Sequence, residues 1–132
     1  MNYLGIYSLP KVEDQRGNLT FLQSPMNVPF AIGRVYWIYG VPGGQTRGSH
    51  AFRSAEEVMI ALSGSFDVRL DNGRQEMVFH LNRSYMGVYI PRLHWRTLEN
   101  FSTNSLCLVL SSTAYDATDY IRSYDEFRSL TE

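Results

Sequence analysis

The chain has 132 residues and a net charge of −1, and 44% of its residues are hydrophobic. This length fits one domain with a single core, so we expect residues 1–132 to form one domain. The near-neutral charge excludes the electrostatic footprint of a general nucleic-acid-binding protein. No apolar run reaches the length of a membrane span, so no membrane partner is expected.

Two further features bear on the compartment. Residues 1–5 lack a basic stretch followed by an apolar run, so the sequence predicts no secretory signal. The single cysteine, Cys107, excludes an internal disulfide and lies in an apolar run, which is typical of a buried, inert thiol. We therefore expect a cytoplasmic protein.

The first third of the chain predicts few regular elements. Residues 14–18 have the composition of a turn, and residues 19–22 are predicted to form a short strand. The two prolines at 25 and 29 indicate a loop. Residues 34–39 then alternate, so that Arg34, Tyr36 and Ile38 share one face of a predicted strand. Val35, Trp37 and Tyr39 share the other face.

The second half of the chain contains a series of strand patterns. Residues 58–62 are apolar on both faces, which predicts a central strand. Residues 66–70 and 75–80 flank Asn72-Gly73, a strong hairpin signal. Further strands are predicted at 87–91, 93–98 and 105–111. Strands at roughly 8–12-residue spacing, with turn signals between them, predict an all-β sandwich or barrel.

The C-terminal tail follows a different pattern. Tyr120, Ile121, Tyr124, Phe127 and Leu130 recur at helical spacing, and Ser123 and Glu126 match a capping box in which Glu126 reaches back to the N-cap. We expect a short C-terminal helix on the sandwich, with its aromatic stripe used for packing.

Residues 43–57 concentrate the ionisable side chains. A glycine-rich lead-in permits a sharp turn, and alternation places His50 and Phe52 on one face. A histidine titrates near neutral pH, so His50 is a candidate general acid or base, flanked by Arg47 and Glu56. A structural histidine at a strand edge remains the alternative. For His80 and His94 a surface position and a partly exposed loop position are the favoured interpretations.

Several arginines could bind phosphate groups, because the guanidinium fork matches phosphate oxygens. Arg34 and Arg47 are the best candidates, since they flank or enter the predicted cavity. Tyr36 shares the strand face of Arg34 and could donate a proton or a hydrogen bond, although packing is the alternative role. The remaining arginines of interest are Arg16, Arg92 and Arg96, and for each of them a solvated surface charge is the favoured interpretation.

The central stretch also has cupin-like spacing. Five residues separate Gly44 from His50, Glu56 follows, and Gly64 closes the run. The later Gly87, Pro91 and His94 loosely match a second cupin motif. However, Phe52 stands where a second histidine would be, and a phenyl ring cannot ligate a metal. Because a cupin metal site needs roughly three histidines and a carboxylate, we expect no metal.

The chain resembles the WxcM-like branch of the cupins, the sugar-nucleotide 3,4-ketoisomerases that act on dTDP-4-keto-6-deoxyglucose. The likeness extends from about Val12 to Leu130. The segments that carry it are residues 14–19, 29–36, 47–51, 62–65 and 115–121.

This resemblance implies a cupin-type jelly-roll sandwich or barrel with a short C-terminal helix. It also implies a homodimer, often with exchanged strands, that binds a dTDP-sugar without metal or cofactor. The implied reaction moves the keto group from C4 to C3 through an enediol, in deoxyamino-sugar biosynthesis for surface polysaccharides. The pair Arg16-Gly17 matches the family members whose product has the galacto configuration.

The resemblance transfers to particular residues. It implies that His50 is the catalytic acid/base, that Tyr36 assists it, and that Trp95 lines the pocket. The implied or candidate substrate-binding residues are Arg16, Arg34, Arg47, Glu56, Trp95 and Arg96. Phe52 and Arg96 replace family histidines. Two hypotheses therefore stay open: an active 3,4-ketoisomerase, or a non-catalytic dTDP-sugar-binding relative or partner subunit. A related epimerase is a third.

Overall fold

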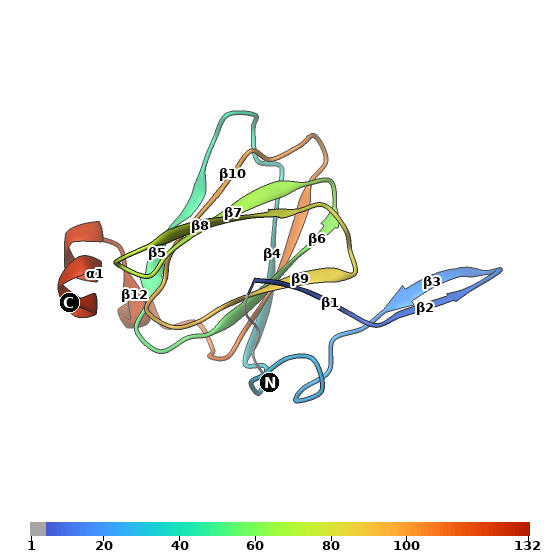
Figure 1. Cartoon of the computed structure of the whole chain (residues 1–132), viewed down its shortest axis with the longest axis horizontal. Coiled ribbons are helices and arrows are strands. Elements are labelled where there is room, and N and C mark those ends of the chain that lie inside the picture. The colour runs from blue at the N-terminus through green and yellow to red at the C-terminus, as the bar shows by residue number, and fades with distance from the viewer. Residues whose placement is uncertain (1–4) are drawn as a thin grey trace.

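Two antiparallel β-sheets pack face to face in the computed structural model, which describes residues 5–132 (Figure 1). In the order of pairing, the first sheet contains β1 (Ile6–Ser8), β9 (Met86–Ile90), β6 (Glu57–Ser63), β11 (Leu106–Ser111) and β4 (Arg34–Tyr39). The second contains β12 (Tyr120–Ile121), β5 (Arg47–Phe52), β10 (Trp95–Glu99), β7 (Phe66–Asp71) and β8 (Glu76–Leu81). A short helix, α1 (Tyr124–Thr131), follows. The predicted all-β jelly-roll sandwich with a C-terminal helix is confirmed.

The main core lies between the two sheets. It includes Met59 and Ala61 from the central strand β6, and Phe66 and Val68 from β7. A second cluster lies on the outer face of the first sheet, where N-terminal residues such as Leu9 and Val28 cover β6 and β11. Strand β6 is therefore buried on both faces from Glu57 to Ala61, as the apolar run at 58–62 predicted for all but its last residue, Leu62.

A β-hairpin projects from the body of the molecule, as Figure 1 shows on the right. It consists of β2 (Lys11–Asp14) and β3 (Gly17–Thr20), paired from Lys11↔Thr20 to Asp14↔Gly17. The predicted strand at 19–22 was therefore wrong in its bounds. The ladder begins directly after the turn, where Gly17 has a φ of 121°, and Leu22 leaves the hairpin to pack on the outer cluster.

Strand β10 also starts later than predicted, at Trp95 instead of Leu93. Leu93 adopts a positive φ of 56° and donates its backbone N–H to the Phe52 carbonyl oxygen at 2.8 Å. This turn places Arg96 of β10 opposite His50 of β5. The register between these two strands thus builds the centre of the site described below.

The helical pattern of the tail was extended too far towards the N-terminus. Tyr120 and Ile121 form β12, which pairs with Phe52 and Ala51 of β5. The helix begins after Ser123, whose Oγ accepts a hydrogen bond from the Glu126 backbone N–H, as predicted. The Glu126 side chain does not reach back to the N-cap, because its carboxylate pairs with Arg53 at 2.5 Å.

Candidate active site

An open cavity of about 540 Å³ lies at the mouth of the sandwich between β4 on one sheet and β5, β10 and β12 on the other. The polar residues that line it include Tyr36, Arg47, His50, Arg96, Tyr120 and Arg122. Strand alternation explains which side chains face inward. His50 and Phe52 lie together, with ring centroids 4.9 Å apart, whereas Ala51 between them faces Ile121 and Phe127.

Arg96 connects the buried polar groups of the cavity. Its Nε donates to His50 Nε2 at 3.0 Å, its Nη1 donates to Glu57 Oε1, and its Nη2 donates to the Tyr36 hydroxyl at 3.2 Å. The Tyr36 hydroxyl in turn donates to Glu57, with oxygen–oxygen distances of 3.0 and 2.9 Å. Four side chains from β4, β5, β6 and β10 therefore form one continuous network across both sheets.

Glu57 supplies the negative charge of this network. Glu57 is 0% exposed, and a buried carboxylate requires cationic partners. Arg96 provides the close ion pair, and Nη2 of Arg34 lies 3.8 Å from the other carboxylate oxygen. Arg47 and Arg122 line the cavity nearby. The surplus of arginines makes the cavity suitable for an anionic group such as a pyrophosphate.

Two pKa shifts define the protonation of the site. Burial, followed by the charges of Arg96, Arg122 and Arg34, lowers the pKa of His50 to about 3. His50 is therefore neutral near physiological pH. Burial raises the pKa of Tyr36, so its phenol keeps its proton and serves as a hydrogen-bond donor.

The structure brings together five of the residues predicted for the site. His50, Tyr36, Arg47 and Arg96 line the cavity, and Arg34 adjoins it, with its guanidinium 5.0 Å from the centre of the Tyr36 ring.

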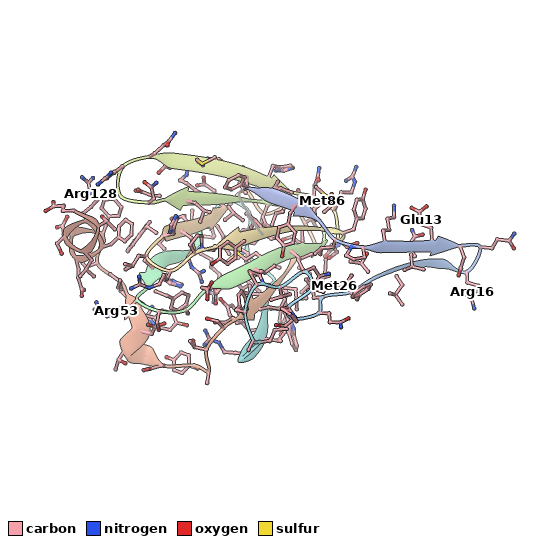
Figure 2. The ribbon with its side chains drawn as sticks, turned by 60° about the horizontal axis from the view of Figure 1, so that its bottom comes forward. Glu13, Arg16, Met26, Arg53, Met86 and Arg128 are labelled. Atoms are coloured by element: carbon pink, nitrogen blue, oxygen red, sulfur yellow. The ribbon has the colours of Figure 1, made fainter. Side chains whose placement is uncertain are left out.

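Three other predicted residues lie outside the cavity of their own chain. Arg16 is at the tip of the projecting hairpin, labelled at the far right of Figure 2, where it pairs with Asp14 at 2.7 Å. Glu56 accepts a hydrogen bond from the Tyr89 hydroxyl. Trp95 packs against the helix, with its ring centroid 5.3 Å from that of Tyr124.

The other two histidines also lie elsewhere. His80 is exposed and pairs with Asp67 at 2.6 Å, which agrees with the predicted surface position. Nδ1 of His94 lies 3.0 Å from the Arg92 carbonyl oxygen, beside a separate apolar hollow. Cys107 is buried in the core, and burial raises the pKa of its thiol to about 12, in agreement with the inert thiol predicted.

Three further side chains of the cavity and its network were not predicted for the site. Cupin spacing directed attention to Glu56, although Glu57 shares its strand face with Met59 and Ala61, and this alternation places its side chain inside the sandwich. Tyr120 was assigned to a helical pattern, and Arg122 was given no role. The signal that could have found them is the extended Tyr-Ile-Arg stretch before the helix cap Ser123.

Two searches of residues 5–132 gave negative results. No group of three or more His, Cys, Asp and Glu side chains in this part of the chain could hold a metal ion. Within the same residues, no helix combines the length and the apolar character that crossing a membrane requires.

The fold and the site together define a cupin-type jelly roll whose open, arginine-rich cavity contains a buried neutral histidine. The chain belongs to the FdtA family, whose model, described as "WxcM-like, C-terminal", matches residues 2–132.

Individual relatives agree with this assignment. Over 123 residues the chain is 37% identical to the TDP-4-oxo-6-deoxy-alpha-D-glucose-3,4-oxoisomerase of Aneurinibacillus thermoaerophilus, covering 93% of this chain and 88% of the relative. It is 43% identical to the TDP-quinovose 3,4-ketoisomerase WlaRB of Campylobacter jejuni, with a TM-score of 0.90 and coverage of 94% and 95%. It is 36% identical to the sugar 3,4-ketoisomerase QdtA of Thermoanaerobacterium thermosaccharolyticum, solved in complex with TDP, with a TM-score of 0.93 and coverage of 96% and 93%.

Proposed function

We propose that this chain is a sugar-nucleotide 3,4-ketoisomerase that acts on dTDP-4-keto-6-deoxyglucose and moves its keto group from C4 to C3. The observation that carries the proposal is His50, held neutral and buried at the wall of an arginine-rich cavity. Membership of the FdtA family supports the substrate class, because two of the relatives named above are 3,4-oxo- or ketoisomerases named for TDP-sugars.

The proposed reaction is a proton transfer through an enediol. The C4 carbonyl acidifies the proton on C3, which leaves as the enediol forms, and C4 is then reprotonated. His50 is the acid/base residue and Tyr36 assists it, since both line the cavity and share the Arg96 network. Arg34 and Arg47, joined by Arg122, supply positive charge for the pyrophosphate.

The alternative is a dTDP-sugar-binding protein without catalysis, because Phe52 replaces a family histidine. Phe52 is 4% exposed, and its ring contacts His50 and lies under the Arg96 guanidinium at 4.8 Å. This packing leaves His50 and Tyr36 in contact with the cavity, which supports catalysis over binding alone. Incubation of the purified protein with dTDP-4-keto-6-deoxyglucose, followed by carbon NMR, tests the proposal. A ketone at C3 supports it, and recovery of unchanged substrate at full protein occupancy refutes it.

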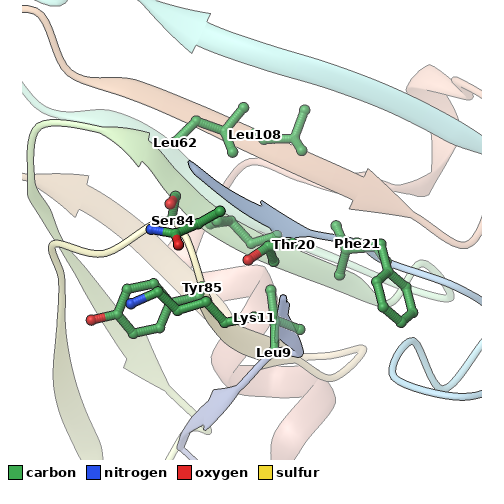
Figure 3. Close-up of a pocket in the computed structure, with 11 residues that line it drawn as sticks. Leu9, Lys11, Thr20, Phe21, Leu62, Ser84, Tyr85 and Leu108 are labelled. Carbon is green, nitrogen blue, oxygen red and sulfur yellow. The ribbon is translucent and has the colours of Figure 1, made fainter. Parts of the chain in front are cut away.

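The chain also presents an apolar surface that supports a homodimer. On the outer face of the first sheet, Trp37, Tyr39 and Leu62 are 58%, 70% and 42% exposed. The surface continues into a groove of about 340 Å³ at the base of the hairpin, which Leu62 and Leu108 line on one side and Leu9 on the other (Figure 3). The projecting hairpin exposes Val12 and Leu19 as well. We propose that a second copy covers this surface, with the two hairpins related by two-fold symmetry.

A charge placed in the groove should disrupt this dimer. We expect Leu62→Arg to shift the protein to the monomer in light scattering after gel filtration, because the arginine would be buried without a partner. Met77→Arg is the matched control, since Met77 is also exposed, at 52%, but lies on β8 of the other sheet. A monomeric wild-type protein, or a dimer in the Leu62→Arg variant, would refute the proposed interface.

We propose that Arg16 acts in the pocket of the second copy, because it lies at the tip of the projecting hairpin and outside the cavity of its own chain. Coexpression of Arg16→Ala and His50→Asn subunits should then restore turnover, because each mixed dimer contains an intact pocket with His50 from one subunit and Arg16 from the other. Each variant alone should have low activity. If Arg16 worked in its own chain's pocket, or had no role, the mixed dimers would give no recovery above the separate variants.

A further inference from the structure

The proposed function does not define whether the nitrogen of His50 that faces the cavity carries a proton. An imidazole can present either a lone pair or an N–H to a substrate, and the two have opposite roles in acid/base chemistry. Nε2 of His50 is engaged with Arg96, whereas Nδ1 makes no hydrogen bond to any residue from 5 to 132. The buried side-chain polar atoms that lack a partner in this part of the chain are Arg34 Nε and Ser111 Oγ. Nδ1 is therefore open to the cavity that the ring lines.

We propose that Arg96 is a positioning residue for His50. Its contacts with Glu57 and Tyr36 hold its guanidinium in place, and its hydrogen bond to Nε2 keeps the proton of neutral His50 on Nδ1, where this N–H faces the cavity. The inference deepens the proposed function, because it names the tautomer in which His50 meets the substrate. What it says about the substrate rests on the proposed function. The tautomer itself is a property of the free protein.

The chemistry of the guanidinium determines the tautomer. Arginine has five N–H donors and no acceptor, so Arg96 Nε must donate across the 3.0 Å to His50 Nε2. Nε2 must then carry a lone pair. A neutral imidazole has one proton on nitrogen, which is left on Nδ1. A protonated imidazole would place two N–H groups against each other, so the same contact also disfavours the imidazolium.

Arg96 cannot easily turn away from His50. Arg96 is 2% exposed, its Nη1 pairs with the fully buried Glu57, and its Nη2 donates to the Tyr36 hydroxyl. The ring of Phe52 covers one face of the guanidinium at 4.8 Å. Rotation of the guanidinium would break the ion pair and leave a buried carboxylate uncompensated, which is costly. Glu57 thus acts on His50 through Arg96.

The other groups around His50 leave this arrangement intact. The ring centroids of Phe52 and Tyr120 lie 4.9 Å from that of the imidazole, and neither side chain accepts the Arg96 Nε–H that is donated to Nε2. Arg122 and Arg34 add positive charge that further favours the neutral ring. No carboxylate other than Glu57 is hydrogen-bonded within the network in the described part of the chain.

The consequence for the reaction is that His50 first meets the substrate as a donor, with its Nδ1–H facing the C4 oxygen, where negative charge develops. To take the C3 proton at Nδ1, His50 must first move its own proton from Nδ1 to Nε2. Nε2 can carry that proton only when its hydrogen bond from Arg96 is broken. The C3 proton then binds to Nδ1 and is returned from the same nitrogen to C4. The Arg96 hydrogen bond therefore separates the resting donor form of His50 from its base form.

Nitrogen-15 NMR of the imidazole rings tests the proposal in the free protein. The chain has three histidines, so a two-bond proton–nitrogen spectrum near neutral pH is simple, and loss of one pattern in His50→Asn assigns His50. We expect the wild type to show a protonated Nδ1 and an unprotonated Nε2. In Arg96→Met, the Nε2 resonance should move to the protonated region, because the Nε2–H tautomer predominates once the donor is removed.

Arg122→Met is the matched control. It removes a positive charge that also lowers the pKa of His50 but makes no hydrogen bond to it, so the Nδ1–H pattern should persist. If Arg96→Met fails to fold, Arg96→Met/Glu57→Gln removes both buried charges and should give the same Nε2–H pattern. A wild-type protein with a protonated Nε2, or an Arg96 variant that retains Nδ1–H, overturns the proposal. Because no substrate is present, these outcomes are independent of whether the protein turns over a dTDP-sugar.

Discussion

Replacement of His50 by asparagine should lower the rate of 3,4-isomerisation by roughly 10²–10⁴-fold, the range that a positioned acid/base side chain contributes. Asparagine keeps a polar side chain beside Arg96 but cannot exchange a proton with the substrate. Since His50 is only 9% exposed and Arg47 and Arg122 remain in place, the dissociation constant for TDP should change little. The loss should therefore appear in kcat.

His80→Asn is the matched control for this substitution, because His80 is exposed on β8 and pairs with Asp67. Its kcat should equal that of the wild type. If His50→Asn retained the wild-type kcat, or lost TDP binding along with activity, His50 would be a structural residue and the proposed chemistry would have to move elsewhere in the cavity.

Removal of either charge of the Glu57–Arg96 pair should cost roughly 3–5 kcal/mol of stability, because the remaining charge is left buried without its partner. Glu57 and Arg96 side chains are 1% and 2% exposed. The double variant Glu57→Met/Arg96→Met should lose much less than the sum of the two single Met variants, since it removes both charges together. Urea unfolding at a fixed protein concentration measures all four proteins.

The exposed pair Arg69–Glu76 provides the comparison, with side chains 39% and 49% exposed. Solvent screens such pairs, so Glu76→Ala should cost no more than about 1 kcal/mol. Additive losses in the Glu57 and Arg96 variants, or single losses as small as that of Glu76→Ala, would show that the buried network contributes little to folding. In that case Arg96 would also be free to move away from His50.

The fold could be predicted well from local patterns, because strand alternation and turn residues act over a few positions. Strand alternation grouped His50 with Phe52 and Tyr36 with Arg34, as the structure has them, and Asn72-Gly73 correctly marked a hairpin between β7 and β8. The errors occurred where tertiary contacts override the local pattern. Tyr120 and Ile121 have helical spacing but pair with β5, and Leu93 leaves the strand pattern to satisfy the Phe52 carbonyl.

The site was less predictable, because it depends on which strands become neighbours. Nothing in the sequence around Glu57 reveals that β6 would face Arg96 of β10, 39 residues away. The spacing of the cupin motif favoured Glu56 instead. Only the position of Glu57 on the same strand face as Met59 and Ala61 distinguishes the two glutamates. Trp95 was assigned to the pocket by family position, whereas the helix that covers it is specified by Tyr124 and Phe127.

The central claim is that this chain, without a second histidine at Phe52, moves a proton between C3 and C4 of a dTDP-4-keto sugar. Proton NMR of dTDP-4-keto-6-deoxyglucose with the wild-type protein in D2O tests it most directly. We predict the appearance of a 3-keto product, with deuterium entering at C3 or C4 at a rate that follows the protein concentration. Broadening of the ligand signals without deuterium exchange and without a new product would contradict the claim, and would define a binding protein built on the fold of an isomerase.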